Sequence, residues 1–156
     1  MKSVLFLMLN LAFVTPVIAG GKIEYRLEAI TGGFPFKWSS QVDGGAADKP
    51  KMLESDPFVT GDDFNSFQIK QLKSPPSKPN TYEIELVHNE LGRKKFRSIA
   101  NKNRERSYCV LIGTEIFQCY SFSPEMKGRW EKSSSIYGPF SKDQAEKLVG
   151  SMKSKH

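Results

Sequence analysis

The sequence has few of the side chains on which enzymes and metal sites depend. Of its 156 residues, two are cysteine and two are histidine, and the Cys-x-x-Cys pair, the His-Glu-x-x-His helix and the phosphate loop are all missing. His88 has no second histidine at ligand spacing, so we expect a solvated loop residue. Asp62 and Asp63 suit a helix N-terminus better than a pair of catalytic carboxylates. These absences predict a binding module that is not an enzyme and has no cofactor or metal.

Long apolar runs are equally scarce, and the one that exists stands at the N-terminus. Lys2 precedes a mostly apolar stretch from Val4 to Ile18, which ends with small residues at the two positions that a signal peptidase recognises. A membrane-spanning helix needs about 20 apolar residues, and this run is shorter and contains Asn10. We therefore expect residues 1–19 to be a signal peptide, cleaved near Ala19, and the protein to be periplasmic or secreted.

The charge balance is positive but modest. The formal net charge is +6, which in an exported protein favours an acidic membrane surface or an acidic patch on a protein over nucleic acid as partner. Arg93, Arg97 and Arg104 share one face of a helix predicted within residues 89–106. We expect these arginines to be exposed candidates for partner contact, and a plain soluble basic surface is the alternative.

Alternation and turn signals predict the other elements. A capping box formed by Ser141 and Gln144 begins a C-terminal helix with apolar residues at helical spacing. Expected strands lie at 22–30, 51–54, 66–73, 81–87, within the hairpin 107–120, and at 133–139. The order predicts an α+β domain, with a mixed or antiparallel sheet and two main helices packed on one face. We divide the chain into an N-terminal strand and flexible loop, residues 20–50, and the α+β domain, residues 51–156.

Residues 31–50 are predicted to be irregular and to form the most mobile internal segment, because glycine and proline pairs interrupt any regular element. Three aromatic residues nevertheless fall within five positions, at Phe34, Phe36 and Trp38. They either fold onto the core or form a contact site for a partner. The first interpretation is the stronger one from the sequence.

The two cysteines present a conflict between compartment and turn chemistry. In an exported protein, Cys109 and Cys119 are expected to form a disulfide. A two-residue turn at Gly113-Thr114 would instead place Cys119 opposite Tyr108, on the other face of the sheet. A three-residue loop, or a bulge in the second strand, would bring the cysteines together. We predict a structural disulfide that clips this hairpin.

Three stretches together resemble the first periplasmic domain of SecD, the accessory subunit of the bacterial Sec translocon. The stretch 81–122 has the strand, the glycine-bearing helix with a phenylalanine, and the hairpin of that domain's head. The stretch 134–152 is similar to its closing strand and helix, and 53–69 to its entry segment. The positions that carry the resemblance are Thr60, Gly61, Asp63, Phe64, Gly92, Phe96, Ile136, Gly138, Phe140, Ala145 and Leu148.

The resemblance implies a SecD head fold from about Leu53 to Met152 and an ability to contact other polypeptides. SecD has several membrane spans and a base subdomain, which this sequence lacks, so we do not expect a translocation motor. No catalytic or ligand residue carries over. The predicted function is a non-catalytic periplasmic protein-binding domain, linked to protein export or envelope maintenance. The alternative is an inhibitor or immunity-type protein that binds one toxin or envelope enzyme.

Overall fold

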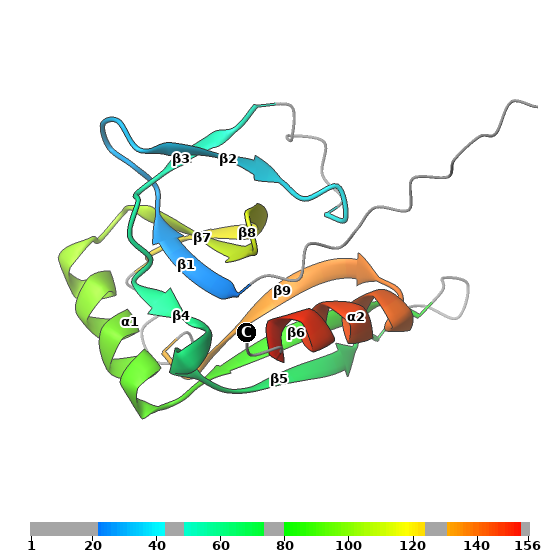
Figure 1. The fold of residues 1–156 in the computed structure, drawn as a ribbon. Coiled ribbons are helices and arrows are strands. Elements are labelled where there is room, and N and C mark those ends of the chain that lie inside the picture. Colours follow the sequence, from blue (N-terminus) through cyan, green and yellow to red (C-terminus); the bar gives the residue numbers. More distant parts are fainter. Residues whose placement is uncertain (1–21, 43–48, 74–79, 124–130, 154–156) are drawn as a thin grey trace, which may run out of the picture.

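The computed structural model describes residues 22–42, 49–73, 80–123 and 131–153. The predicted signal peptide lies outside these residues. The described chain forms a six-stranded sheet, a three-stranded sheet and two α-helices (Figure 1). This is the α+β class that the sequence predicts.

The six-stranded sheet is mixed and has the order β3-β2-β8-β7-β1-β4. All of its neighbouring strands are antiparallel except β2 and β8, which are parallel. Its strands are β1 (Ile23–Leu27), β2 (Phe34–Trp38), β3 (Lys51–Leu53), β4 (Val59–Thr60), β7 (Ser107–Ile112) and β8 (Glu115–Ser121).

The three-stranded sheet is antiparallel, and both helices pack against its central strand, β6. Helix α2 also contacts β5 and β9, whereas α1 also contacts β4 and a short 3-10 helix, η1. The bounds are β5 (Phe64–Gln71), β6 (Tyr82–His88), β9 (Ser133–Phe140), α1 (Glu90–Lys102), α2 (Lys142–Lys153) and η1 (Gly61–Asp63).

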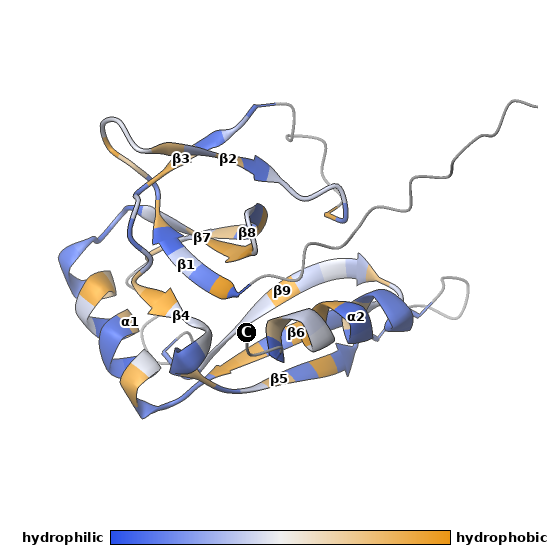
Figure 2. Cartoon of the chain, viewed as in Figure 1, coloured by the Kyte–Doolittle hydropathy of each residue, from blue (hydrophilic) through white to orange (hydrophobic). Residues whose placement is uncertain are grey.

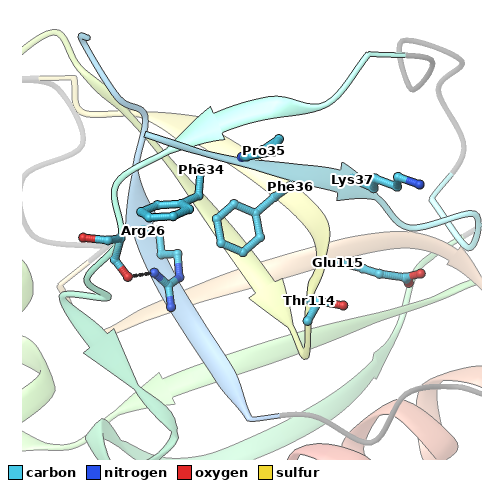
Figure 3. A pocket seen from close by; sticks show the side chains of 8 residues that line it. Arg26, Phe34, Pro35, Phe36, Lys37, Thr114 and Glu115 are labelled. Atoms are coloured by element: carbon cyan, nitrogen blue, oxygen red, sulfur yellow. Dashed lines mark hydrogen bonds between the residues drawn. The ribbon is translucent and has the colours of Figure 1, made fainter. Parts of the chain in front are cut away.

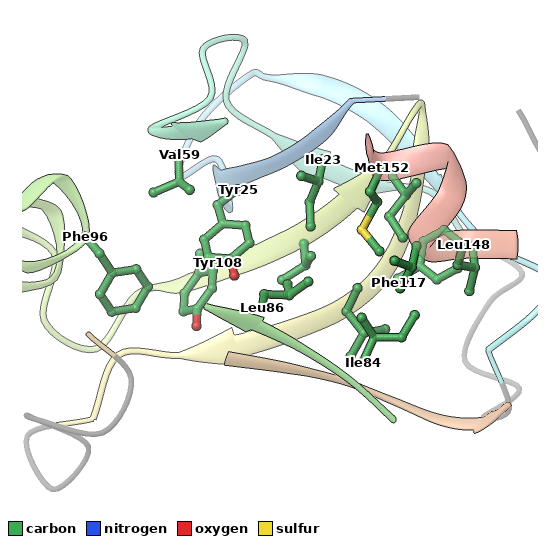
Figure 4. Packing of buried hydrophobic residues seen from close by; sticks show 14 of the residues in the cluster. Ile23, Tyr25, Val59, Ile84, Leu86, Phe96, Tyr108, Phe117, Leu148 and Met152 are labelled. Atoms are coloured by element: carbon green, nitrogen blue, oxygen red, sulfur yellow. The ribbon is translucent and has the colours of Figure 1, made fainter. Parts of the chain in front are cut away.

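The main core lies between the two sheets and the helices (Figure 4). Strand β1 buries every second residue, as its alternating sequence predicts. Helix α2 contributes an apolar stripe, visible as orange bands in Figure 2, and begins with the predicted capping box. Tyr25 of β1 shares a hydrogen bond with Ser134 of β9, so a satisfied polar contact joins the two sheets inside this core.

The segment predicted to be irregular contains a strand, which corrects the sequence interpretation. Residues 34–38 form β2, which pairs with β3 on one side and with β8 at Lys37 and Trp38 on the other. Pro35 and the flanking glycines hide the period-two pattern. Residues 43–48 of the predicted mobile segment lie outside the described chain.

The six-stranded sheet rolls back toward itself at its β3 edge. Leu53 forms an antiparallel bridge with Glu28, just beyond the end of β1. The Ala29 amide donates to the Met52 carbonyl at 3.0 Å, and the Glu54 amide to the Leu27 carbonyl at 2.9 Å. The rolled sheet encloses a second, smaller core of Leu53, Cys109, Leu111 and Ile116, with Phe36, Trp38 and Cys119 packed against it.

A buried carboxylate joins η1 to α1. Asp63 is fully buried and accepts hydrogen bonds from the Thr60 amide and, at 2.9 Å to each oxygen, from the Lys95 ammonium. The Asn89 amide donates to the Asp63 carbonyl at 2.9 Å, and the Asn89 side chain accepts from Gly92 as the cap of α1. Thr60 is therefore the N-cap of η1, and Asp63, at its third position, completes the capping box and also anchors the next helix.

Gly92 is the residue that lets α1 approach η1 so closely. A Cβ atom at Gly92 would lie 2.2 Å from the Asp63 carbonyl oxygen, whereas a Cβ at Gly150, in α2, would meet nothing within 4 Å. We expect Gly92→Ala to lower the free energy of unfolding by about 3 kcal/mol through steric overlap. Gly150→Ala should raise it by up to about 1 kcal/mol, because alanine favours a helix.

Urea unfolding followed by circular dichroism checks both glycine variants. Gly150→Ala is the matched control, since it makes the same change in the other helix. Equal unfolding midpoints for the two variants would show that the contact at Gly92 does not constrain the fold.

Candidate functional site

An open hollow of about 630 Å³ lies between β1 and β2, where the rolled sheet has no pairing between these strands. Phe34 and Phe36 point from β2 toward Arg26 on β1, and the turn between β7 and β8 borders the far end (Figure 3). The lining residues are Arg26, Phe34, Pro35, Phe36, Lys37, Ser55, Thr114 and Glu115.

A second hollow of about 460 Å³ adjoins the first and shares Phe34 and Ser55 with it. It is lined by Ala29, Ile30, Thr31, Gly33, Phe34, Glu54, Ser55 and Asp56. The two neighbouring hollows are together named the β2 groove here. Gly33 has a φ of 90°, and a Cβ there would lie 2.7 Å from the Leu53 carbonyl oxygen, so glycine is required where the groove wall turns into β2.

The three aromatic residues of β2 divide between core and surface. Phe36 and Trp38 are half-buried and pack against the small core, which agrees with the core interpretation. Phe34 is 59% exposed, and its neighbour in the groove, Ile30, is 78% exposed. Exposed apolar side chains that adjoin in a hollow with a polar rim are typical of interaction sites. A contact between Phe34 and a partner stays a prediction.

The charge of Arg26 is neutralised inside the groove. Its Nε and Nη2 donate to Glu24 Oε2 at 2.9 and 2.6 Å, and its Nη1 donates to the carbonyls of Glu54 and Ser55. The guanidinium carbon also lies 5.2 Å from the centre of the Phe36 ring, at cation–π distance. Arg26 therefore links β1 to residues 54 and 55 at the base of the groove.

The rim of the β2 groove has different charges at its two ends. Lys37 and Glu115 are directly opposite each other where β2 meets β8. Glu54 and Asp56 border the other end, where Glu54 pairs with Arg106. Asp56 is exposed and forms no ion pair with any residue in the described part of the chain. One end of the groove thus offers a carboxylate that has no cationic partner among the described residues.

The arginines predicted to form a basic face on α1 have different environments. Arg97 is exposed and pairs with Glu131 at 2.6 Å, and Arg104 is exposed but lies beyond the end of α1 at Lys102. Arg93 is half-buried, and its proximity contributes to lowering the pKa of His88, so the expectation that Arg93 is exposed is wrong. Lys94 pairs with Glu90 along the helix. The basic face is therefore partly neutralised.

His88 is a core residue, which corrects the prediction of a solvated loop. It is 1% exposed and its ring lies 5.0 to 5.6 Å from those of Tyr25, Phe64 and Phe96. Its Nδ1 lies 3.1 Å from the Glu131 carbonyl oxygen. The alternation of buried residues on β6, Ile84 and Leu86, extends to His88, so the two-residue period of the strand could have predicted that His88 is buried. Burial lowers the pKa of His88 below its ordinary value.

Cys109 and Cys119 form a disulfide, with their Cα atoms 4.0 Å apart. The two-residue turn at Gly113-Thr114 is present, with Ile112 opposite Glu115. The register then shifts, so that Leu111 faces Ile116 while Val110 faces Gln118, and Phe117 is the extra residue of a bulge. Of the routes open from the sequence, the structure uses the bulge in the second strand. The disulfide lies in the small core beneath β2.

The described residues contain no group of three or more histidine, cysteine, aspartate or glutamate side chains that could hold a metal ion. Within the same ranges, neither helix has the length and apolar character needed to cross a membrane.

No protein-family model and no curated protein matches the chain. Two solved structures that share the fold are of SecDF. One is of "a membrane component SecDF that enhances protein export", with a TM-score of 0.59 and 12% identity over 85% of this chain and 62% of that chain. The other is of SecDF "in Super-membrane-facing form", with a TM-score of 0.60 and 13% identity over 86% of this chain and 19% of that chain.

The chain thus spans less than two thirds of either SecDF chain. The SecD-like fold implied by the sequence resemblance is confirmed. At 12–13% identity the likeness concerns the fold alone, and it does not carry SecDF's role in protein export to this chain.

The burial of His88 predicts a loss of stability in mild acid. Its folded pKa is lowered, so as the pH falls through about 6.5 the unfolded state takes up the proton first. The free energy of unfolding should therefore fall below about pH 6.5 and stop changing below the folded pKa. Urea midpoints measured between about pH 7.5 and pH 5 check this, and His88→Phe should remove the His88 part of the slope. Parallel curves for both proteins would contradict it.

The disulfide should stabilise the hairpin without a redox role. It links residues separated by 10 positions, so chain-entropy arguments give about 2–3 kcal/mol of stabilisation. Unfolding in urea with and without a reductant measures this difference. The double variant Cys109→Ala, Cys119→Ala is the control, and its midpoint should not respond to reductant. An unchanged wild-type midpoint in reductant would show that the bond does not stabilise the folded state.

Proposed function

We propose that this chain is a non-catalytic domain that binds other polypeptides outside the cytoplasm, in protein export or envelope maintenance. The observation that carries the proposal is the β2 groove, in which exposed Phe34 and Ile30 adjoin a polar rim. Such a surface is costly to leave in water and is typical of a protein interaction site. The SecD-like fold supports the same class of function by analogy.

Two features support a location outside the cytoplasm. The N-terminal sequence has the three-part pattern of a secretory signal. The Cys109–Cys119 disulfide belongs in an oxidising compartment, since cytosolic thiols are kept reduced. An acidic membrane surface is a second candidate partner, for two exposed cations without a described ion pair at the C-terminal end of α1 and just beyond it, Lys102 and Arg104.

The same groove would also serve an inhibitor or immunity-type protein. The two functions differ in the range of partners. An export or maintenance factor binds many unfolded chains with modest affinity, whereas an inhibitor binds one folded protein tightly.

Binding of a permanently unfolded protein tests the proposal. The mature domain should bind reduced, alkylated lactalbumin in a fluorescence titration and should not bind the native, disulfide-bonded lactalbumin, because only the unfolded chain exposes apolar segments. A folded basic protein of similar size and charge is the control for non-specific attraction. Failure to bind the unfolded protein would overturn the proposal, and capture of a single folded protein from a periplasmic extract would favour the inhibitor.

A further inference from the structure

We infer that the β2 groove binds an extended polypeptide segment in which a lysine or arginine stands next to bulky apolar side chains. This inference rests on the proposed function and specifies both the chemistry of the segment and the residues that recognise it. Two features of the groove carry it: an aromatic wall at its centre, and an uncompensated carboxylate at one end.

The aromatic wall accounts for the apolar part of the segment. Phe34 lines both hollows, so it is the central contact of the groove, and Pro35 and Phe36 extend the apolar wall along β2 (Figure 3). The larger hollow, about 630 Å³, lies in the size range of small-ligand pockets. It has room for bulky apolar side chains. Aromatic residues at the centre of a contact surface supply most of its binding energy.

The uncompensated carboxylate accounts for the basic residue. Inside the groove, the Arg26 charge is already matched by Glu24 at 2.6 Å, and Lys37, at the end away from residues 54–56, lies opposite Glu115. At the end formed by residues 54–56, Asp56 is exposed and has no ion pair among the described residues, and Glu54 shares its charge with Arg106. A cationic side chain of the bound segment would meet Asp56 next to Phe34. Complementary charges of this kind determine which partner is selected.

Recognition falls to side chains because β2 is a poor template for an added strand. Its residues 34–36 pair with β3 on one edge only. Pro35 has no backbone N–H, and proline on an edge strand is one of the devices that prevent further strand pairing. The segment would therefore lie across the groove in an extended form, held by apolar and ionic contacts.

Fluorescence anisotropy with three labelled peptides tests the inference on the full mature domain. The first peptide combines two lysines with leucine and phenylalanine, the second replaces the lysines by glutamate, and the third replaces the apolar residues by serine. The wild-type domain should bind the first peptide at least about tenfold more tightly than either of the others, because each of the others lacks one of the two kinds of anchoring side chain.

Two groove variants and two matched controls locate the site. Phe34→Ser should weaken binding of the lysine peptide by at least about tenfold. Asp56→Lys should reverse the charge preference, so that the glutamate peptide binds more tightly than the lysine peptide. Tyr137→Ser and Glu146→Lys make comparable changes, an aromatic residue to serine and a carboxylate to lysine, at exposed positions on β9 and α2 away from the groove, and should leave binding unchanged. Melting curves show that each variant is folded. If Phe34→Ser does not fold, the peptide preference of Asp56→Lys still tests whether the groove is the binding site.

The outcomes separate this inference from the proposed function. An unchanged preference in Asp56→Lys, or equal losses in the groove and control variants, would overturn the groove assignment. If both groove variants still bind unfolded lactalbumin as the wild type does, the domain binds polypeptides elsewhere and only the groove assignment fails. If the wild type binds no unfolded polypeptide, the proposed function fails with it.

Discussion

The closure of the six-stranded sheet between Glu28 and Leu53 is the constraint on which the rest of the molecule's surface depends. The bridge and its two flanking backbone hydrogen bonds bring β3, and with it β2, over the face of β1, β7 and β8. This arrangement covers the small core and the disulfide, of which Cys109 is fully buried and Cys119 half-buried. Because β2 meets β8 only at its C-terminal end, the same closure leaves the opening between β1 and β2. The groove is therefore a consequence of incomplete closure.

The positions that resemble SecD mainly have structural roles. Asp63 is a buried cap with a lysine partner, and Gly92 allows α1 to lie against it. Phe96 fills the core between Tyr25, His88 and Tyr108. These residues explain why the resemblance predicts the fold. They also explain why it gives no site, since none of the three lies in the groove.

Much of the fold follows from local pattern, and the parts that do not have identifiable physical reasons. The alternation of β1, the capping box of α2 and the turn at η1 were all predictable, because each depends on neighbouring residues. Strand β2 was not, since its five residues include a proline and its pairing to β3 and β8 is a tertiary effect. The bulge at Phe117 lies between these cases. The glycine-threonine pair correctly predicts a two-residue turn, and the oxidising compartment correctly predicts a disulfide. A bulge in β8 makes the two compatible.

The candidate site was predictable only in part, for a related reason. The aromatic residues of β2 stand out in the sequence, but their division between core and surface depends on where β3 covers them. Asp56 and Arg26 are unremarkable in sequence, and they meet Phe34 only through the rolled sheet. Residues 29–37 also precede the stretch that resembles SecD, which begins near Leu53. The sequence resemblance therefore carries no information on the aromatic wall, which lines one groove with Arg26 and Asp56 only in the folded sheet.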